Sequence, residues 1–123
     1  MSLPILEFNS VNPLIYPFGS MPAMNLFVFL VHIPIVFGFG TAAYWIIGYI
    51  KKFYGGRPIP EEWRSFWMAM VWGTIHELIE TLILYQWVVG QVLMIVFFVV
   101  QVIAGIYLIW GSYLLAKKYI IRG

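Results

Sequence analysis

An almost continuous apolar stretch from Trp63 to Ala116 constrains this chain more than any other feature of its sequence. As a single helix rising about 1.5 Å per residue, the stretch would be roughly 80 Å long, whereas the hydrocarbon core of a bilayer is about 30 Å thick. The stretch must therefore fold back on itself. The segment Tyr85–Gln91, "YQWVVGQ", combines interfacial aromatic residues, two amides and a glycine, as expected of a turn at a membrane surface. We predict one membrane helix over 60–88 and another over 89–118.

A further apolar segment, Asn25–Ile50, precedes these two and stops at Lys51 and Lys52. Because roughly 20 apolar helical residues suffice to cross a bilayer, we predict a membrane helix over 24–52. Composition agrees, since hydrophobic residues make up 63% and charged residues 10% of the 123, against about 25% charged residues in soluble domains. The predicted fold class is all-α, a polytopic integral membrane protein with three transmembrane helices.

The basic residues predict how these helices are oriented. All seven lie in two groups, one around the first loop and one in the tail: Lys51, Lys52, Arg57, Arg64, Lys117, Lys118 and Arg122. Because basic residues concentrate in cytoplasmic segments, we predict a cytoplasmic loop over 53–59 and a cytoplasmic tail over 119–123, with the N-terminus outside. Both groups have the positions of membrane-edge anchors, and nothing in them indicates nucleic-acid binding.

Residues 1–23 combine prolines and asparagines with large apolar side chains. Proline interrupts helices and central strands, and the segment lacks the basic region that begins a cleavable signal peptide. We predict an irregular apolar segment that lies along the outer membrane face or against another subunit.

The segment "GTIHELIETL", Gly73–Leu82, places ionisable side chains inside the second predicted span. At 100° per residue with His76 at the origin, Glu80 lies at about 40° and Glu77 at about 100°, and the neighbouring glycine and threonines share this arc. The opposite arc is apolar and is predicted to face lipid: Val71, Ile75, Leu78, Ile79, Leu82 and Ile83. Because ionisable residues within a span are costly when unpaired, the polar arc is predicted to face protein or a water-filled cavity.

The other two spans offer polar partners at matching depth. His32 and Glu80 each lie about seven residues from the outer end of their helix, or about 10 Å below the outer surface. His76 and Glu77 lie about one turn deeper, level with Gln101 of the third span. The predicted packing face of that span carries Gln101, Gly105 and Ser112. We predict one outer-leaflet polar cluster that contains His32, His76, Glu77, Glu80 and Gln101.

A metal site is one interpretation of this cluster. His76 and Glu80 are one helical turn apart, and with His32 they form a ligand set suited to copper, iron or zinc. Glu77 and Gln101 would then support the ligands. Haem, with His32 and His76 as axial ligands, is a variant of this interpretation. The chain has no cysteine, which excludes thiolate ligands.

Three other interpretations remain open. The histidines and glutamates could form a proton relay, because histidine titrates near neutrality. They could instead be hydrogen-bonded pairs that set helix register. A quinone or lipid headgroup pocket is the third, with aromatic walls from Tyr44, Trp45 and Trp72.

Scarce polar loops and helices that are apolar on nearly every side favour a subunit over a self-sufficient enzyme or carrier. The general size is similar to that of small three-span subunits of respiratory complexes. The sequence therefore predicts an integral subunit of a larger complex, redox or respiratory, in the cell (plasma) membrane. Its partners are the lipid bilayer and other membrane subunits, and its cluster serves metal or haem binding, electron transport or proton transport. The alternatives are a structural scaffold subunit and a homo-oligomeric ion or proton channel.

Overall fold

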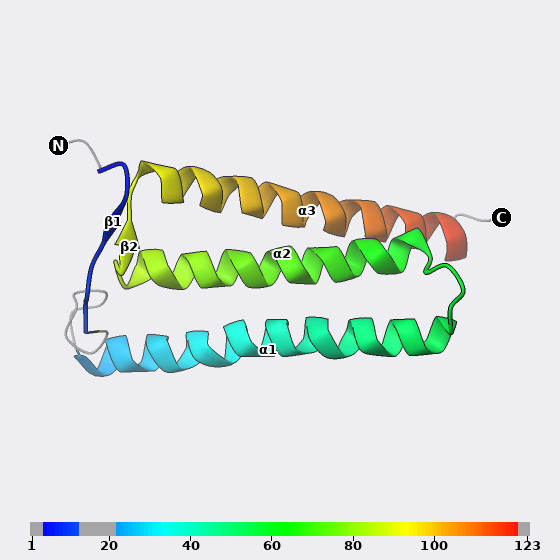
Figure 1. Ribbon diagram of the computed structural model, residues 1–123, viewed down its shortest axis with the longest axis horizontal. Helices are drawn as coiled ribbons and strands as arrows, with labels where there is room; N and C mark the ends of the chain where they lie inside the picture. Colours follow the sequence, from blue (N-terminus) through cyan, green and yellow to red (C-terminus); the bar gives the residue numbers. More distant parts are fainter. Residues whose placement is uncertain (1–3, 13–21, 121–123) are drawn as a thin grey trace.

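The computed structural model describes residues 4–12 and 22–120, and three long helices dominate them: α1 (Pro22–Tyr54), α2 (Glu61–Leu84) and α3 (Gln91–Tyr119). The helices lie side by side as an antiparallel row with α2 in the middle (Figure 1). α2 contacts both neighbours, whereas α1 and α3 make no close backbone contact within the described residues. The prediction of an all-α chain with three helices is confirmed. The row leaves both flanks of α2 uncovered between its neighbours.

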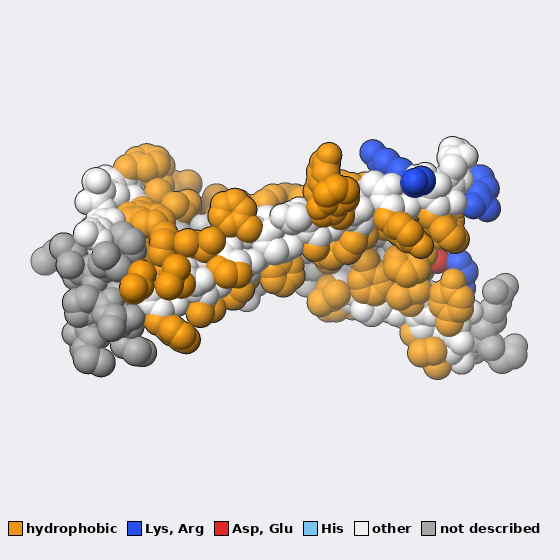
Figure 2. Space-filling view, turned by 90° about the horizontal axis from the view of Figure 1, so that it is seen from below, with side chains coloured by type: hydrophobic (Ala, Val, Ile, Leu, Met, Phe, Trp, Pro, Cys, Tyr) orange, Lys and Arg blue, Asp and Glu red, His pale blue; other side chains and the backbone are white. Residues whose placement is uncertain are grey.

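Most apolar side chains of this row face outward. Large hydrophobic side chains of α1 and α3 are widely exposed, whereas the buried hydrophobic residues are few, and Figure 2 shows apolar side chains along the whole length of one face. The accessible surface is 8579 Å², against about 6,800 Å² for a compact soluble protein of 14.3 kDa. By length and composition, Leu26–Tyr54 and Gln91–Tyr119 could each cross a membrane.

The helix ends follow local sequence signals. α1 ends where Gly55 adopts a positive φ of 53°, and the Gly55 amide donates to the Lys51 carbonyl at 3.0 Å, which is a common way to close a helix. α2 begins after Pro60, with Glu61 and Glu62 in its first turn, where carboxylates complement the positive end of the helix dipole.

The turn between α2 and α3 differs from the prediction. The helix predicted over 60–88 ends at Leu84, and β2 (Val88–Val89) pairs antiparallel with β1 (Glu7–Phe8). The cause is tertiary: Tyr85 is fully buried and its ring lies 5.6 Å from that of Phe29 on α1. This burial of a large aromatic side chain anchors the end of α2.

Residues 4–12 pack against this turn of their own chain. The amides of Gln91 and Val92 donate to the carbonyls of Pro4 and Ile5, at 2.9 and 3.2 Å. Because the first amides of a helix have no partner within the helix, these carbonyls cap α3. The predicted irregular segment 1–23 is therefore wrong where β1 forms and where α1 already begins at Pro22; residues 1–3 and 13–21 lie outside the described part.

α2 and α3 pack closely at Gly111. A Cβ atom there would lie 3.2 Å from the Ser65 Cβ and 3.4 Å from the Glu62 carbonyl, and Gly111 and Val100 are the buried residues of α3. Gln101 and Ser112 are exposed. The predicted packing face of α3 is therefore wrong, because the face that meets α2 runs through Val100 and Gly111.

Gly111→Leu is expected to destabilise the protein by about 1 to 3 kcal/mol, since the added side chain overpacks a close helix contact. Gly105→Leu is the matched control, because nothing lies within 4 Å of a Cβ at Gly105 and both changes raise helix propensity alike. Thermal unfolding in one detergent measures both variants. Equal stabilities would show that α2 and α3 do not meet at Gly111.

Side-chain hydrogen bonds join the helices at the basic end of the row, where α1 ends and α2 begins. The Lys118 Nζ contacts Glu62 Oε1 at 2.9 Å, and the Trp110 Nε1 donates to Glu61 Oε1 at 2.9 Å. Both carboxylates at the start of α2 are thus engaged by α3. On the other side of α2, the Trp67 Nε1 donates to the Ala43 carbonyl of α1 at 2.8 Å.

Candidate metal centre

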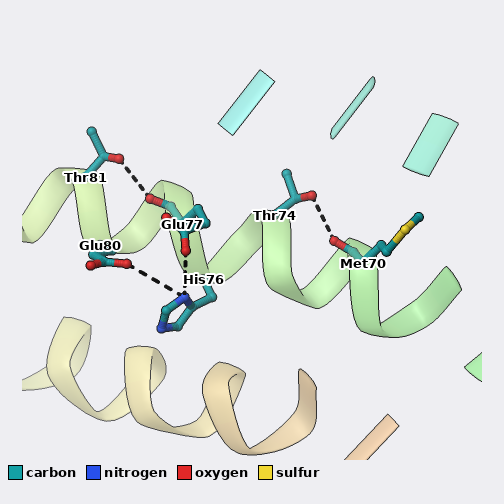
Figure 3. A network of polar contacts seen from close by, with 6 residues as sticks. All are labelled: Met70, Thr74, His76, Glu77, Glu80 and Thr81. Carbon is teal, nitrogen blue, oxygen red and sulfur yellow. Dashed lines mark hydrogen bonds and ion pairs between the residues drawn. The ribbon is translucent and has the colours of Figure 1, made fainter. Parts of the chain in front are cut away.

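One turn of α2 carries three potential metal ligands that converge. His76 Nδ1 lies 3.6 Å from Glu77 Oε1 and 3.9 Å from Glu80 Oε2, and Figure 3 shows both carboxylates directed at the imidazole. Glu80 follows His76 by four residues, so it lies on the same side of the helix. Glu77 is adjacent in sequence, and its side chain reaches back to the same imidazole nitrogen.

The imidazole of His76 is held by its packing on α3. Its ring stacks on Phe97 with centroids 4.7 Å apart and an interplanar angle of 25°. Within the described residues its buried Nε2 has no hydrogen-bond partner. The side chains of His76, Glu77 and Glu80 are 19%, 24% and 35% exposed. Stacking thus orients Nδ1 toward the carboxylates, which remain reachable from one flank of α2.

The threonines of the polar arc face the other neighbour. In Figure 3, Thr74 and Thr81 point away from His76, and a Cβ at Gly40 of α1 would meet Thr74 Cγ2 at 3.5 Å. Their hydroxyls donate to the carbonyls of Met70 and Glu77, four residues back, at 2.8 Å each. The polar arc therefore runs from α3 round to α1, and Glu77 lies on the open flank between them.

The opposite arc of α2 was predicted to face lipid as a whole. Ile79 is buried, so that prediction is wrong at this position. Leu78 is 48% exposed, as expected. Ile79 is buried because α1 and α3 together cover a wider part of the α2 surface than the polar arc, so they also cover part of the opposite arc.

The spacing of the three ligand atoms suits a metal ion. All three atoms lie within 4.8 Å of one another. In a tetrahedral site with metal–ligand distances near 2.1 Å, ligand atoms lie about 3.4 Å apart, so small side-chain rotations would bring this group to ligation. His76, Glu77 and Glu80 could therefore hold a metal ion. A single helix supplies all three ligands, which leaves a fourth position for water or another molecule.

His32 does not join this group. Its Nδ1 donates to the Val28 carbonyl at 2.9 Å, and its side chain lines an apolar groove of about 410 Å³ with Leu78 and Thr81. α1 packs on the threonine side of α2, whereas His76 faces α3. The predicted ligand set of His32, His76 and Glu80 is thus not assembled, and the two histidines do not face each other as haem ligands would.

Gln101 is exposed on α3, so the structure does not place it beside the cluster as a supporting residue. The predictions that His32 and Gln101 join the cluster both rest on matching depth. Depth in the membrane does not specify which side of a helix meets its neighbour. Glu77 was assigned a supporting role, yet its carboxylate lies nearer to His76 Nδ1 than that of Glu80 does. The signal for Glu77 was present in the sequence as a carboxylate adjacent to the histidine.

The predicted quinone walls do not enclose one site. Tyr44 and Trp45 are 72% and 68% exposed, and their rings contact each other edge to face at 5.7 Å. Trp72 lies on α2 with its Nε1 buried. These residues are therefore outward-facing aromatics of α1 and a packed aromatic of α2.

No model of a known protein family matches this chain, and no curated protein or solved structure matches it.

Proposed function

We propose that this chain is a three-span integral membrane subunit of a larger membrane complex, and that its His76, Glu77 and Glu80 side chains bind one divalent transition metal ion. The observation that carries the proposal is the convergence of three ligand atoms within 4.8 Å on one turn of the middle helix. All three groups sit in α2, between two helices that are each apolar enough to cross a membrane.

Charge balance supports a divalent cation. Two ionised carboxylates inside a membrane span carry a large desolvation cost unless they are neutralised. A protonated His76 compensates only one of them, whereas a divalent ion compensates both and leaves the imidazole neutral for ligation. This balance also explains how α2 could span a bilayer although its sequence contains these polar groups.

The ligand set favours zinc or iron over copper(I), because carboxylates are hard ligands and the site has no thiolate. Iron would suit the predicted redox role, and zinc would suit a structural role that fixes α2. Electron transport and proton transport remain predictions that depend on which ion is bound.

The open flank of α2 supports membership in a larger assembly. Glu77 is partly exposed on the flank that neither α1 nor α3 covers, and the metal centre has a free fourth position there. A helix of another subunit could supply that ligand and cover the flank. In the scaffold alternative, the same flank of α2 would bind another subunit without a metal. In the channel alternative, the α2 flanks of identical chains would pack against one another.

Elemental analysis of the protein, purified in mild detergent with whatever accompanies it, tests the metal proposal. We expect about one zinc or iron per chain. Co-purified membrane subunits would support the complex, whereas a single-species oligomer that conducts ions in liposomes would favour the channel. The absence of metal at equilibrium with added zinc and iron would refute the metal centre.

Cysteine labelling tests the proposed topology, and the lack of native cysteine makes it direct. We expect Lys52→Cys and Lys117→Cys to react with an impermeant maleimide only after the cell is opened, and Ser10→Cys to react in intact cells. The reason is that basic residues mark the cytoplasmic ends of spans. Labelling of Lys52→Cys and Lys117→Cys on opposite sides would show that α2 and α3 do not both cross.

A further inference from the structure

An apolar groove runs between α1 and α2 at the basic end of the row. Its volume is about 280 Å³, and four of its six lining residues are aromatic: Ile46, Tyr49, Ile50, Phe53, Tyr54 and Trp63. A second groove shares Ile46, Ile50 and Trp63 with it and continues toward the middle of α2 as far as Met70. Together they form one apolar surface, the basic-end groove, with the apolar lining that an acyl chain requires.

Arg57 is held beside the mouth of this groove. Its Nε donates to the Tyr54 carbonyl at 2.8 Å and its Nη2 donates to the Phe53 carbonyl at 3.0 Å, and both of these residues line the groove. A guanidinium has five N–H donors, so Arg57 keeps donors for a further ligand.

The mouth of the basic-end groove is positively charged, because the carboxylates at the start of α2 are engaged elsewhere. Glu61 and Glu62 are bound by Trp110 and Lys118 of α3, so they are directed away from α1. Within the described residues, the ion pairs are those of His76 with Glu77 and Glu80 and that of Lys118 with Glu62, and none includes the basic residues around the first loop. Figure 2 shows the lysine and arginine side chains of this face at one end.

We propose that the basic-end groove binds one anionic phospholipid, with an acyl chain along its aromatic lining and the phosphate at Arg57. The inference rests on the proposed membrane span of α1 and α2. Guanidinium groups match phosphate oxygens in geometry as well as charge, and basic pockets between membrane helices select anionic headgroups. Tyr49, Tyr54 and Trp63 belong to the aromatic types that concentrate where headgroups meet hydrocarbon.

The groove around His32 provides an internal contrast. It also lies between α1 and α2 and is lined almost entirely by apolar residues, including Phe29, Phe37 and Trp87. Neither groove has a lysine or arginine in its lining, but Arg57 is hydrogen-bonded to two residues that line the basic-end groove. Within the described residues, no hydrogen bond holds a lysine or arginine side chain at the lining of the groove around His32. Lipid that enters this groove would therefore be held without selection for charge, whereas the basic-end groove would select anionic lipid.

Native mass spectrometry of the full chain, with the subunits that accompany it, tests the lipid site. The probes are phosphatidylglycerol and phosphatidylcholine with identical acyl chains, added in equal amounts. We expect retention of phosphatidylglycerol at least about tenfold above phosphatidylcholine. Arg57→Gln should lower phosphatidylglycerol binding about fivefold, the effect of one basic residue near an anionic surface, and leave phosphatidylcholine binding unchanged.

Lys117→Gln is the matched control, because it removes one positive charge at the same end of the molecule on α3. Equal retention of both lipids, or an equal effect of Lys117→Gln, would overturn the proposal. Displacement of phosphatidylglycerol by millimolar inorganic phosphate would assign the mouth to free phosphate instead. If Arg57→Gln fails to fold because it frees the last carbonyls of α1, the ratio of the two lipids retained by the wild-type chain carries the test.

The same preparation separates this inference from the proposed function. A chain that resists alkaline carbonate extraction and holds its metal, yet shows no lipid selectivity, would refute the lipid site alone. Release of the chain by carbonate would refute the membrane span itself.

Discussion

His76→Ala should lower metal affinity by at least about 100-fold, because loss of a supporting residue beyond the ligands already costs 10- to 100-fold and His76 is itself a proposed ligand. The variant would leave two carboxylates on one helix turn without the nitrogen ligand that lies 3.6 and 3.9 Å from them. Metal content by elemental analysis after dialysis against a weak chelator measures the loss.

Glu77→Gln and His32→Ala distinguish the two possible ligand sets. The structure brings Glu77 together with His76 and Glu80, whereas the sequence predicts His32 in its place. Glu77→Gln should lower metal affinity as Glu80→Gln does, because both carboxylates face the imidazole. His32→Ala should leave it unchanged, because His32 bonds to Val28 of its own helix. Thr74→Ala is the control on α2, since its hydroxyl bonds to Met70. Metal loss in His32→Ala but not in Glu77→Gln would overturn the present assignment.

Gly90→Ala is expected to destabilise the protein by about 3 kcal/mol or more, from backbone strain and steric overlap together. Gly90 has φ 149° and ψ 168°, a region that is essentially restricted to glycine. A Cβ atom there would overlap the Ile5 carbonyl oxygen and lie 2.7 Å from the Leu6 Cα. Relief of the overlap would move the segment that caps α3 and would separate β1 from β2.

Thermal unfolding and amide hydrogen exchange measure this effect. The amides of Gln91 and Val92 should exchange faster in Gly90→Ala, because their acceptors are the carbonyls of Pro4 and Ile5. Gly38→Ala is the control: Gly38 is helical, and nothing lies within 4 Å of a Cβ there, so it should be neutral or slightly stabilising. Unchanged exchange at both amides in Gly90→Ala would show that the N-terminal segment does not cap α3.

The three helices could be predicted because their signals are local. The length of each apolar segment, the basic residues after Ile50 and the prolines before Glu61 are all read along the chain. The convergence of His76, Glu77 and Glu80 was also predictable, since the geometry of one helix turn places these side chains together whatever surrounds them. The metal interpretation of α2 therefore came from sequence alone.

The failed predictions about the candidate site concern which helix faces meet. Equal depth suggested that His32 and Gln101 join the cluster, but depth leaves the rotation of each helix about its axis undetermined. Packing decides that rotation: Gly111 lets α3 approach α2 on the side of His76, and the Trp67 bond to Ala43 holds α1 on the other side. An apolar helix in an apolar solvent carries almost no amphipathic signal that would reveal this choice.

The sequence by itself determined the number and approximate positions of the helices, the ionisable turn of α2 and the basic end of the row, because each depends on residues close together in the chain. Only the tertiary structure decided the order of the row, the exclusion of His32 and the capping of α3 by Pro4 and Ile5. These depend on close packing and on backbone hydrogen bonds between residues more than 80 positions apart. Such contacts form only where the whole chain satisfies its buried polar groups and steric fits at once.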